Sequence, residues 1–127
     1  MNENDIAKII VDRSLRVHRT LGPGLLESVY EEALSYELNQ AGLGIERQVS
    51  LPVIYNGIRM DLGFRIDIRV NKKLIIEIKS VEEIAPVHHK QILTYLRLTE
   101  LKLGLLINFN VNLIKDGIQR VVNNLSE

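Results

Sequence analysis

The sequence predicts a mixed α/β (α+β) fold in which two helices precede a three-stranded antiparallel meander, and a helix and a strand follow it. Three observations predict this order. Apolar residues recur at helical spacing up to Ala41, and from Val49 onward they alternate with polar residues as in half-buried strands. Asn56-Gly57 interrupts that alternation as a two-residue hairpin turn. We expect residues 1–127 to form a single domain, because one hydrophobic core commonly spans about 100–150 residues.

The composition excludes several classes of protein. Lys plus Arg and Asp plus Glu both number 16, so any affinity for nucleic acid must come from a local patch of charge. The chain has no cysteine, which excludes disulfides, thiolate catalysis and cysteine-based metal centres. No apolar stretch approaches the roughly 20 residues that cross a bilayer, and the polar start at residues 1–5 differs from a signal peptide. We therefore expect a cytoplasmic protein that does not bind a membrane.

The two N-terminal helices have recognisable ends. We expect Asn4 or Asp5 to cap the first helix, and Gly22-Pro23-Gly24 to end it, since glycine and proline are unfavourable inside a helix. The second helix has a broad apolar stripe and ends near Gly42 and Gly44. Its stripe consists of Leu26, Val29, Tyr30, Ala33, Leu34, Leu38 and Ala41.

The meander begins with two strands joined at Asn56-Gly57. Pairing Tyr55 with Ile58 across that turn aligns the apolar faces of both strands. Pro52 has no N–H for a ladder, which places the first strand at a sheet edge. The second strand has one apolar and one charged face. The apolar residues are Ile58, Met60, Leu62, Phe64, Ile66, Ile68 and Val70, and those between them are Arg59, Asp61, Gly63, Arg65, Asp67 and Arg69.

The loop before the third strand, residues 74–79, decides how that strand pairs. A two-residue turn at positions 71–72 would set its polar side chains beneath the apolar side of the preceding strand. We prefer a three-residue loop over positions 71–73, because it keeps the apolar residues on one face. The expected pairs are then Val70 with Leu74, Ile68 with Ile76, and Ile66 with Ile78. In that register Asp67 lies directly opposite Glu77.

The C-terminal part of the chain predicts a helix and a buried strand. The helix is expected from about Ala85 or Pro86 to Leu98, because proline is tolerated in a first helical turn. Residues 103–109 form a short apolar strand. Residues 113–125 contain an Asp-Gly turn signal but have ambiguous periodicity, so both strand and helix remain open there.

The opposed acids Asp67 and Glu77 are the feature that points to chemistry. Carboxylates about 5 Å apart on neighbouring strands destabilise a sheet unless a cation, a shared proton or a basic neighbour neutralises them. Lys79 lies on the same face as Glu77, and arginines flank Asp67, so a solvated face of ion pairs is one interpretation. The apolar run over positions 74–76, however, predicts a strand covered on both sides, where unpaired charges are costly. Two acids at its end suit a hard divalent cation such as Mg²⁺.

Three motifs carry a resemblance to a known family. Asp67 followed by Glu77-Ile78-Lys79 resembles the acid…(D/E)-x-K signature of the PD-(D/E)xK nuclease superfamily. Gln91-Ile92-Leu93-Thr94-Tyr95 is similar to the Q-x-x-x-Y element of its RecB and lambda-exonuclease branch. Gly24-Leu25-Leu26-Glu27-Ser28-Val29-Tyr30 resembles the pattern of the small bacterial GxxExxY family, which is grouped with these nucleases. The resemblance spans roughly residues 17–109 and implies a restriction-endonuclease-like core with an extra N-terminal helix.

The resemblance also implies a metal site. Asp67, Glu77 and the backbone carbonyl of Ile78 would ligate Mg²⁺, with Mn²⁺ as a substitute. Glu27 would contribute to the same site directly or through water. Lys79 would orient the attacking water or stabilise charge at the phosphate. These four side chains and one carbonyl are the expected catalytic and metal-binding groups.

Further residues are expected to support this site or contact substrate. Gln91 and Tyr95 lie four residues apart on one helix face, and His88 lies on the same face. Tyr30 is expected to pack in the core, and its hydroxyl group is a further candidate to reach the site. A basic patch would attract the substrate. It would consist of Lys72, Lys73, Lys79, His88, His89, Lys90 and Arg97.

The implied activity is metal-dependent hydrolysis of phosphodiester bonds in DNA or RNA, with DNA preferred. Two alternatives remain open. One is a catalytically inactive nuclease-fold module that binds or assists a partner protein, which the zero net charge and few aromatic residues favour. The other is a structural homo-oligomer in which the acids only form ion pairs.

Overall fold

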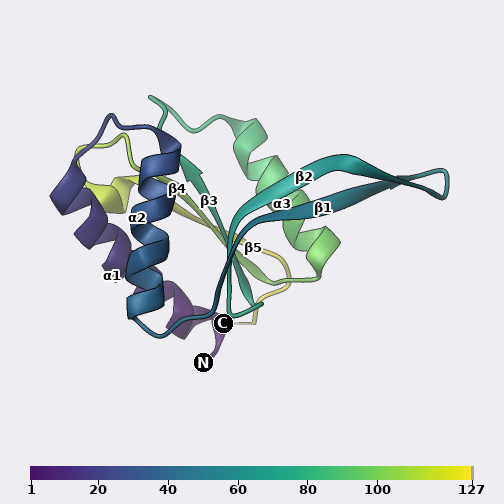
Figure 1. Ribbon diagram of the computed structural model, residues 1–127, viewed down its shortest axis with the longest axis horizontal. Helices are drawn as coiled ribbons and strands as arrows, with labels where there is room; N and C mark the ends of the chain where they lie inside the picture. The colour runs from purple at the N-terminus through teal and green to yellow at the C-terminus, as the bar shows by residue number, and fades with distance from the viewer. Residues whose placement is uncertain (127) are drawn as a thin grey trace.

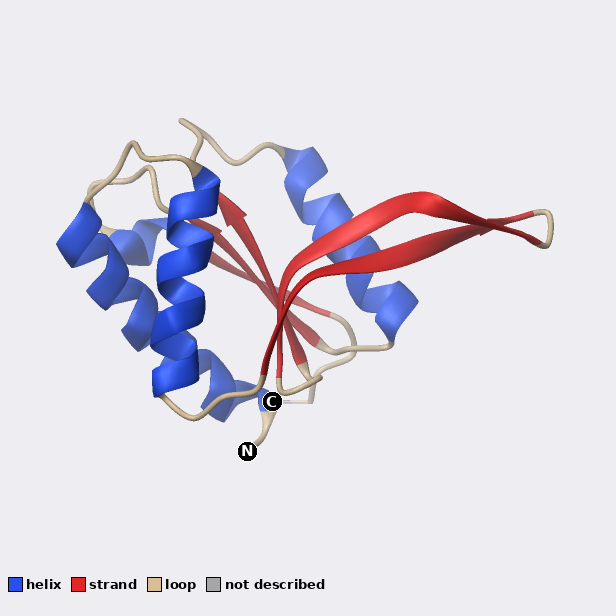
Figure 2. Ribbon diagram, viewed as in Figure 1, coloured by secondary structure: helices blue, strands red, loops and turns tan. Residues whose placement is uncertain are grey.

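The computed structural model describes residues 1–126, apart from the side chain of Leu62, and shows three α-helices around one five-stranded sheet (Figures 1 and 2). The helices are α1 (Glu3–Leu21), α2 (Glu27–Gln40) and α3 (Pro86–Thr99). The strands are β1 (Ile45–Tyr55), β2 (Ile58–Val70), β3 (Leu74–Lys79), β4 (Leu103–Asn108) and β5 (Ile118–Val122), with a 3₁₀ turn η1 (Ile114–Gly117) before β5. Their order in the sheet is β1-β2-β3-β4-β5, and only β3 and β4 run parallel. The predicted fold class, a restriction-endonuclease-like α+β arrangement, is confirmed.

Helices cover both faces of the sheet and form two apolar cores. Helices α1 and α2 lie on one face and α3 lies on the other (Figure 2). The larger core joins α1 and α2 to the sheet, through residues such as Ile10, Leu34 and Ile76. The smaller core lies under α3. It consists of Ile66, Ile75, Ile92, Tyr95 and Leu96. β3 is therefore buried on both sides, as its apolar run predicts.

The ends of the helices differ from the expectation in one place. Asn2, rather than Asn4 or Asp5, caps α1: its side chain accepts the Asp5 N–H at 2.8 Å, and the Asp5 carboxylate accepts the Asn2 N–H at 3.2 Å. This reciprocal capping box satisfies two backbone donors at once, so the helix begins before the residues expected to cap it. Helix α3 begins at Pro86, as predicted. No helix among residues 1–126 is long and apolar enough to span a membrane.

The strand pairing within the meander confirms most of the predicted register. Tyr55 pairs with Ile58 around Asn56-Gly57, whose φ angles of 50° and 75° suit the predicted two-residue turn. β1 lies at the sheet edge, as its proline predicts. The three-residue loop between β2 and β3 is also confirmed. It produces the pairs Val70–Leu74 and Ile68–Ile76.

The ladder between β2 and β3 ends at Ile68–Ile76, two pairs earlier than expected, so Asp67 and Glu77 do not form the expected ladder pair. Ile66 does not pair with Ile78: it packs beneath α3, whereas Ile78 belongs to the core beneath α1 and α2. Ile68, two residues after Ile66, lies in that first core as well. The regular alternation of β2 is therefore broken at Asp67, and the acid occupies the place where the strand changes faces.

Candidate active site

The side chains of Asp67 and Glu77 replace the backbone pairing that β2 and β3 lack beyond Ile68. Oε1 of Glu77 accepts the backbone N–H of Asp67 at 3.2 Å. Oδ2 of Asp67 accepts the backbone N–H of Ile78 at 2.8 Å. Each carboxylate thus binds the strand that carries the other, and these bonds bring the two acids together although the predicted ladder pair between them is absent. A backbone N–H satisfies only part of the bonding capacity of a carboxylate, so each acid retains lone pairs for a further partner.

Burial makes this pair electrostatically unfavourable without a cation. Glu77 is 4% exposed and Asp67 is half-buried. Burial, together with the negative charge of Asp67, raises the pKa of Glu77 to about 9. Lys79 lowers that pKa only as the smallest of the contributing causes. The site therefore has a deficit of positive charge next to two carboxylates.

Lys79 lies at the end of β3, two residues after Glu77. Its side chain lines a hollow of about 490 Å³ between β2 and α3, together with Phe64 and Gln91. His88 and Lys90 line the same hollow. Within residues 1–126, Lys79 makes no ion pair at 4.0 Å or less. Its ammonium group is therefore available to an anion that enters the hollow.

Tyr95 lies in the smaller core under α3, while Gln91 on the same helix lines the hollow. Tyr95 is 2% exposed, and its ring meets Phe64 edge to face, with centroids 5.3 Å apart. Burial and the negative charge of Glu77 raise the pKa of Tyr95 to about 12. The hydroxyl group thus stays a hydrogen-bond donor close to the carboxylates, in a supporting position.

Glu27 binds the chain immediately after Lys79. Its carboxylate accepts the Ser80 N–H at 3.2 Å, and the Ser80 hydroxyl group donates to the carbonyl of Leu25 at 2.7 Å. These bonds hold the N-terminus of α2 against the end of β3. The start of α3 lies near the same end of β3 (Figure 1). Glu27 thus lies next to the end of β3, and within the described part of the chain it forms no hydrogen bond with Asp67 or Glu77.

Comparison with known proteins adds the family. The family described as the PD-(D/E)XK nuclease superfamily matches residues 4–121. The chain belongs to this superfamily. No curated protein and no solved structure matches the chain.

Membership implies a divalent metal, because PD-(D/E)XK nucleases generally use one. Among residues 1–126, no group of three or more acidic or histidine side chains is arranged to hold a metal ion. One buried and one half-buried carboxyl group, with spare lone pairs and no full counter-charge, nevertheless form a donor set that suits a hard cation. The residues present therefore fit a divalent metal that takes its remaining ligands from the backbone and water.

The sequence patterns did not predict two further residues near the site, Glu31 and Gln48. Glu31, one helical turn after Glu27, is 7% exposed and accepts hydrogen bonds from Arg47 at 2.9 and 3.1 Å. Gln48 donates its side-chain amide to Glu31 at 2.7 Å and to Oδ1 of Asp67 at 3.5 Å. The sequence signal was a second acid at i+4 on the apolar stripe of α2, next to Tyr30.

Tyr30 and His88 have local partners in the superfamily fold. Tyr30 is fully buried and stacks on Phe109 with centroids 4.5 Å apart. Its hydroxyl group donates to the carbonyl of Gly22 at 2.6 Å and accepts the Leu25 N–H at 3.0 Å, so it braces the loop before α2. His88 accepts the Ala85 N–H at 3.0 Å at the start of α3 and still lines the hollow.

The basic residues expected to form one patch are divided between two ends of β3. Lys79, His88 and Lys90 gather at the hollow. Lys72 and Lys73 precede β3 at its other end, where Lys73 donates to the carbonyl of Met1 at 2.6 Å. The expected single patch is wrong, because the strand itself separates residues that are close in sequence.

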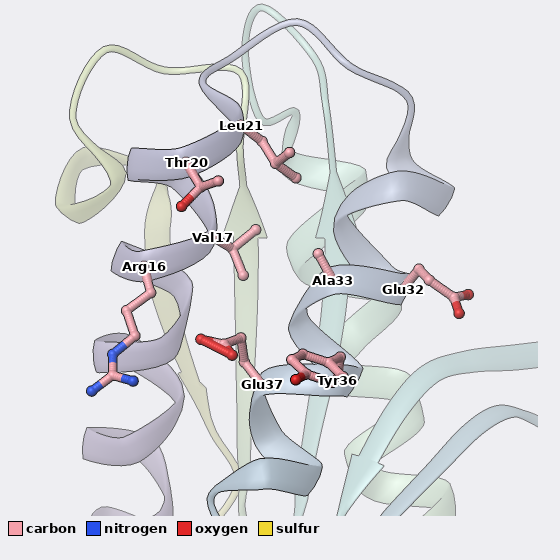
Figure 3. A pocket seen from close by; sticks show the side chains of 8 residues that line it. All are labelled: Arg16, Val17, Thr20, Leu21, Glu32, Ala33, Tyr36 and Glu37. Atoms are coloured by element: carbon pink, nitrogen blue, oxygen red, sulfur yellow. The ribbon is translucent and has the colours of Figure 1, made fainter.

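A second hollow, between α1 and α2, contains none of the expected site residues. It measures about 530 Å³, and Val17, Leu21 and Ala33 point into it from the two helices (Figure 3). Charged side chains such as Arg16 and Glu32 stand at its edges (Figure 3). Its lining has a larger apolar share than the lining of the hollow beside Lys79, although both are mainly apolar.

Proposed function

We propose that this member of the superfamily is a nuclease that hydrolyses phosphodiester bonds of DNA with Mg²⁺, which Mn²⁺ can replace. The supporting observation is the mutual bonding of Asp67 and Glu77 at the end of the β2–β3 ladder, with the unpaired Lys79 beside them. We also propose that it belongs to the bacterial GxxExxY family and to the RecB and lambda-exonuclease branch, on the motifs at residues 24–30 and 91–95.

Each residue has a distinct part in the proposed reaction. Asp67, Glu77 and the carbonyl of Ile78 would hold the metal, and Glu27 would reach it through water. When bound, the metal would lower the pKa of a coordinated water and stabilise charge on the phosphate. Lys79 would contact the phosphate from the hollow and stabilise the negative charge that develops there. Gln91 and His88 line the same hollow and would contact the substrate, while Tyr95 would support the acids from below.

A cleavage assay tests this proposal. Linear, nicked and single-stranded DNA, and RNA, are incubated with the protein plus Mg²⁺, Mn²⁺ or EDTA. We expect metal-dependent cleavage that falls at least 100-fold in Asp67→Asn, Glu77→Gln and Lys79→Ala. Lys115→Ala is the matched control: Lys115 is exposed on η1, so its substitution should leave the cleavage rate unchanged. Equal activity in the wild type and the three site variants would refute the proposed enzyme for these substrates.

One structural observation favours the accessory-module alternative: no three-ligand metal cluster is found among residues 1–126. A binding module would keep the fold and recruit a partner protein or a second copy for the chemistry. Calorimetric titration of Mn²⁺ separates the two functions. Site-dependent binding that Asp67→Asn abolishes supports the enzyme, whereas no binding to the wild type supports the module.

A further inference from the structure

Gln48 has an unusual backbone conformation at the place where β1 meets Asp67. Its φ angle is 51°, in the left-handed region that side chains other than glycine rarely adopt. Arg47 pairs with Ile68 and Val49 pairs with Ile66, so Gln48 lies opposite Asp67, yet these two form no ladder pair. Outliers of this kind persist where the surroundings hold them, and they concentrate at functional sites.

The side chain of Gln48 is anchored at the partly buried ion pair between Glu31 and Arg47. Its Nε2 donates to Oε1 of Glu31 at 2.7 Å. Glu31 is fixed in turn by Arg47, which donates to Oε2 through Nη2 at 2.9 Å and through Nε at 3.1 Å. Although Gln48 is exposed as a residue, its amide therefore ends on a carboxylate that cannot move freely.

The same amide also faces Asp67. An amide nitrogen has two N–H donors, so it can serve two carboxylates at once. Nε2 of Gln48 lies 3.5 Å from Oδ1 of Asp67, at the long end of hydrogen-bond range, while Oδ2 takes the Ile78 N–H at 2.8 Å. The Asp67 carboxylate is thus held on one oxygen by β3 and approached on the other by β1. Long contacts of this kind tighten in many sites once the ligand is bound.

We propose that Gln48 is a positioning residue for Asp67: its amide, fixed by Glu31, orients the Asp67 carboxylate toward the metal. The inference rests on the proposed nuclease function, since it concerns the same site. The left-handed backbone is the device that turns the Gln48 side chain toward both acids. Outer partners of metal ligands orient those ligands, and losing one typically weakens metal binding 10- to 100-fold.

A purely structural role for the strained backbone is the competing explanation, and two substitutions separate it from the proposal. Gln48→Ala removes the amide and keeps the strain. Gln48→Gly removes the amide and relieves the strain, because glycine adopts positive φ readily. Ser50→Ala is the matched control, an exposed position on the same strand.

Two measurements are made on each protein. In the metal-free protein, ¹³C NMR of labelled aspartate follows the Asp67 carboxyl, and the ¹H–¹⁵N spectrum follows the Ile78 amide. Calorimetry then gives the Mn²⁺ dissociation constant. We expect both Gln48 variants to shift both NMR signals and to raise the dissociation constant at least 10-fold, while Ser50→Ala changes neither.

The outcomes distinguish this inference from the proposed function. Wild-type signals and affinity in Gln48→Gly, whatever Gln48→Ala does, would overturn the positioning role. A wild type that neither binds Mn²⁺ nor cleaves nucleic acid would instead overturn the proposed function. In that case the NMR signals of the metal-free variants still decide whether the Gln48 amide orients Asp67.

Discussion

Glu77 accepts the backbone N–H of Asp67 at 3.2 Å, and Asp67 accepts the backbone N–H of the residue after Glu77 at 2.8 Å. The two acids therefore connect neighbouring strands where the regular ladder has ended. The geometry fixes their positions but supplies no positive charge that balances them, and the pKa of Glu77 rises to about 9. Because no positive charge balances these two acids, the stability of the protein should depend on pH and on Mg²⁺.

The stability of the metal-free protein should decrease as the pH rises. The pKa of Glu77 is about 9 in the folded protein against an ordinary value of 4.5, so the folded state holds more protons than the unfolded state between these values. The free energy of unfolding then falls by up to about 1.4 kcal/mol per pH unit in this window. Urea unfolding in EDTA from pH 5.5 to 8.5 measures it. Glu77→Gln, which keeps an oxygen for the Asp67 N–H, should flatten this dependence, and an unchanged slope in that variant would contradict the prediction.

Mg²⁺ should raise the melting temperature at pH 8. A ligand that binds only the folded state stabilises it by about 2.7 kcal/mol at 100 times its dissociation constant. Thermal melts with and without Mg²⁺ measure the effect in wild type and Asp67→Asn, which should lose it. Asp61→Asn is the control, because Asp61 is an exposed acid on the same strand paired with Arg59. The metal site would be disproved if the wild type and Asp67→Asn responded alike.

Tyr30→Phe should destabilise the protein without altering the chemistry of the folded fraction. The substitution leaves the stacking on Phe109 in place but removes the hydroxyl group that bonds to Gly22 and Leu25. We expect a loss of about 1 kcal/mol, since two partly buried hydrogen bonds to the backbone are removed. Chemical denaturation measures this loss. Tyr36→Phe, at an exposed position, should change stability little. A fall in cleavage rate without a fall in stability would instead give Tyr30 a role at the substrate.

Gly63→Ala should destabilise the β1–β2 hairpin. A Cβ atom at this position would collide with the carbonyl oxygen of Leu51, where the register between β1 and β2 shifts. Backbone cannot yield as a side chain can, so we expect a cost of about 1–3 kcal/mol in the free energy of unfolding. Gly44→Ala is the comparison, because its nearest atom is the end of the Asn71 side chain at 3.3 Å. Similar losses in both variants would argue against the steric explanation.

Local pattern was enough to predict the elements and the position of the acids. Asn56-Gly57 and the three-residue loop before β3 fix the pairing of three strands, because a shift of one residue would turn every apolar side chain outward. That register brings Asp67 near Glu77, although the two form no ladder pair. The helix start was misplaced because the Asn2–Asp5 capping box depends on two side chains bonding to each other's backbone.

The sequence by itself determined the order of helices and strands, the meander register and the convergence of Asp67 and Glu77, since all three follow from periodicity and turn chemistry within one stretch of chain. Only the tertiary structure decided that β2 changes faces at Asp67 and that Gln48 connects Glu31 to this acid. The contacts of Gln48 connect side chains of α2, β1 and β2. They depend on how the helices pack across the sheet, which no local spacing of residues encodes.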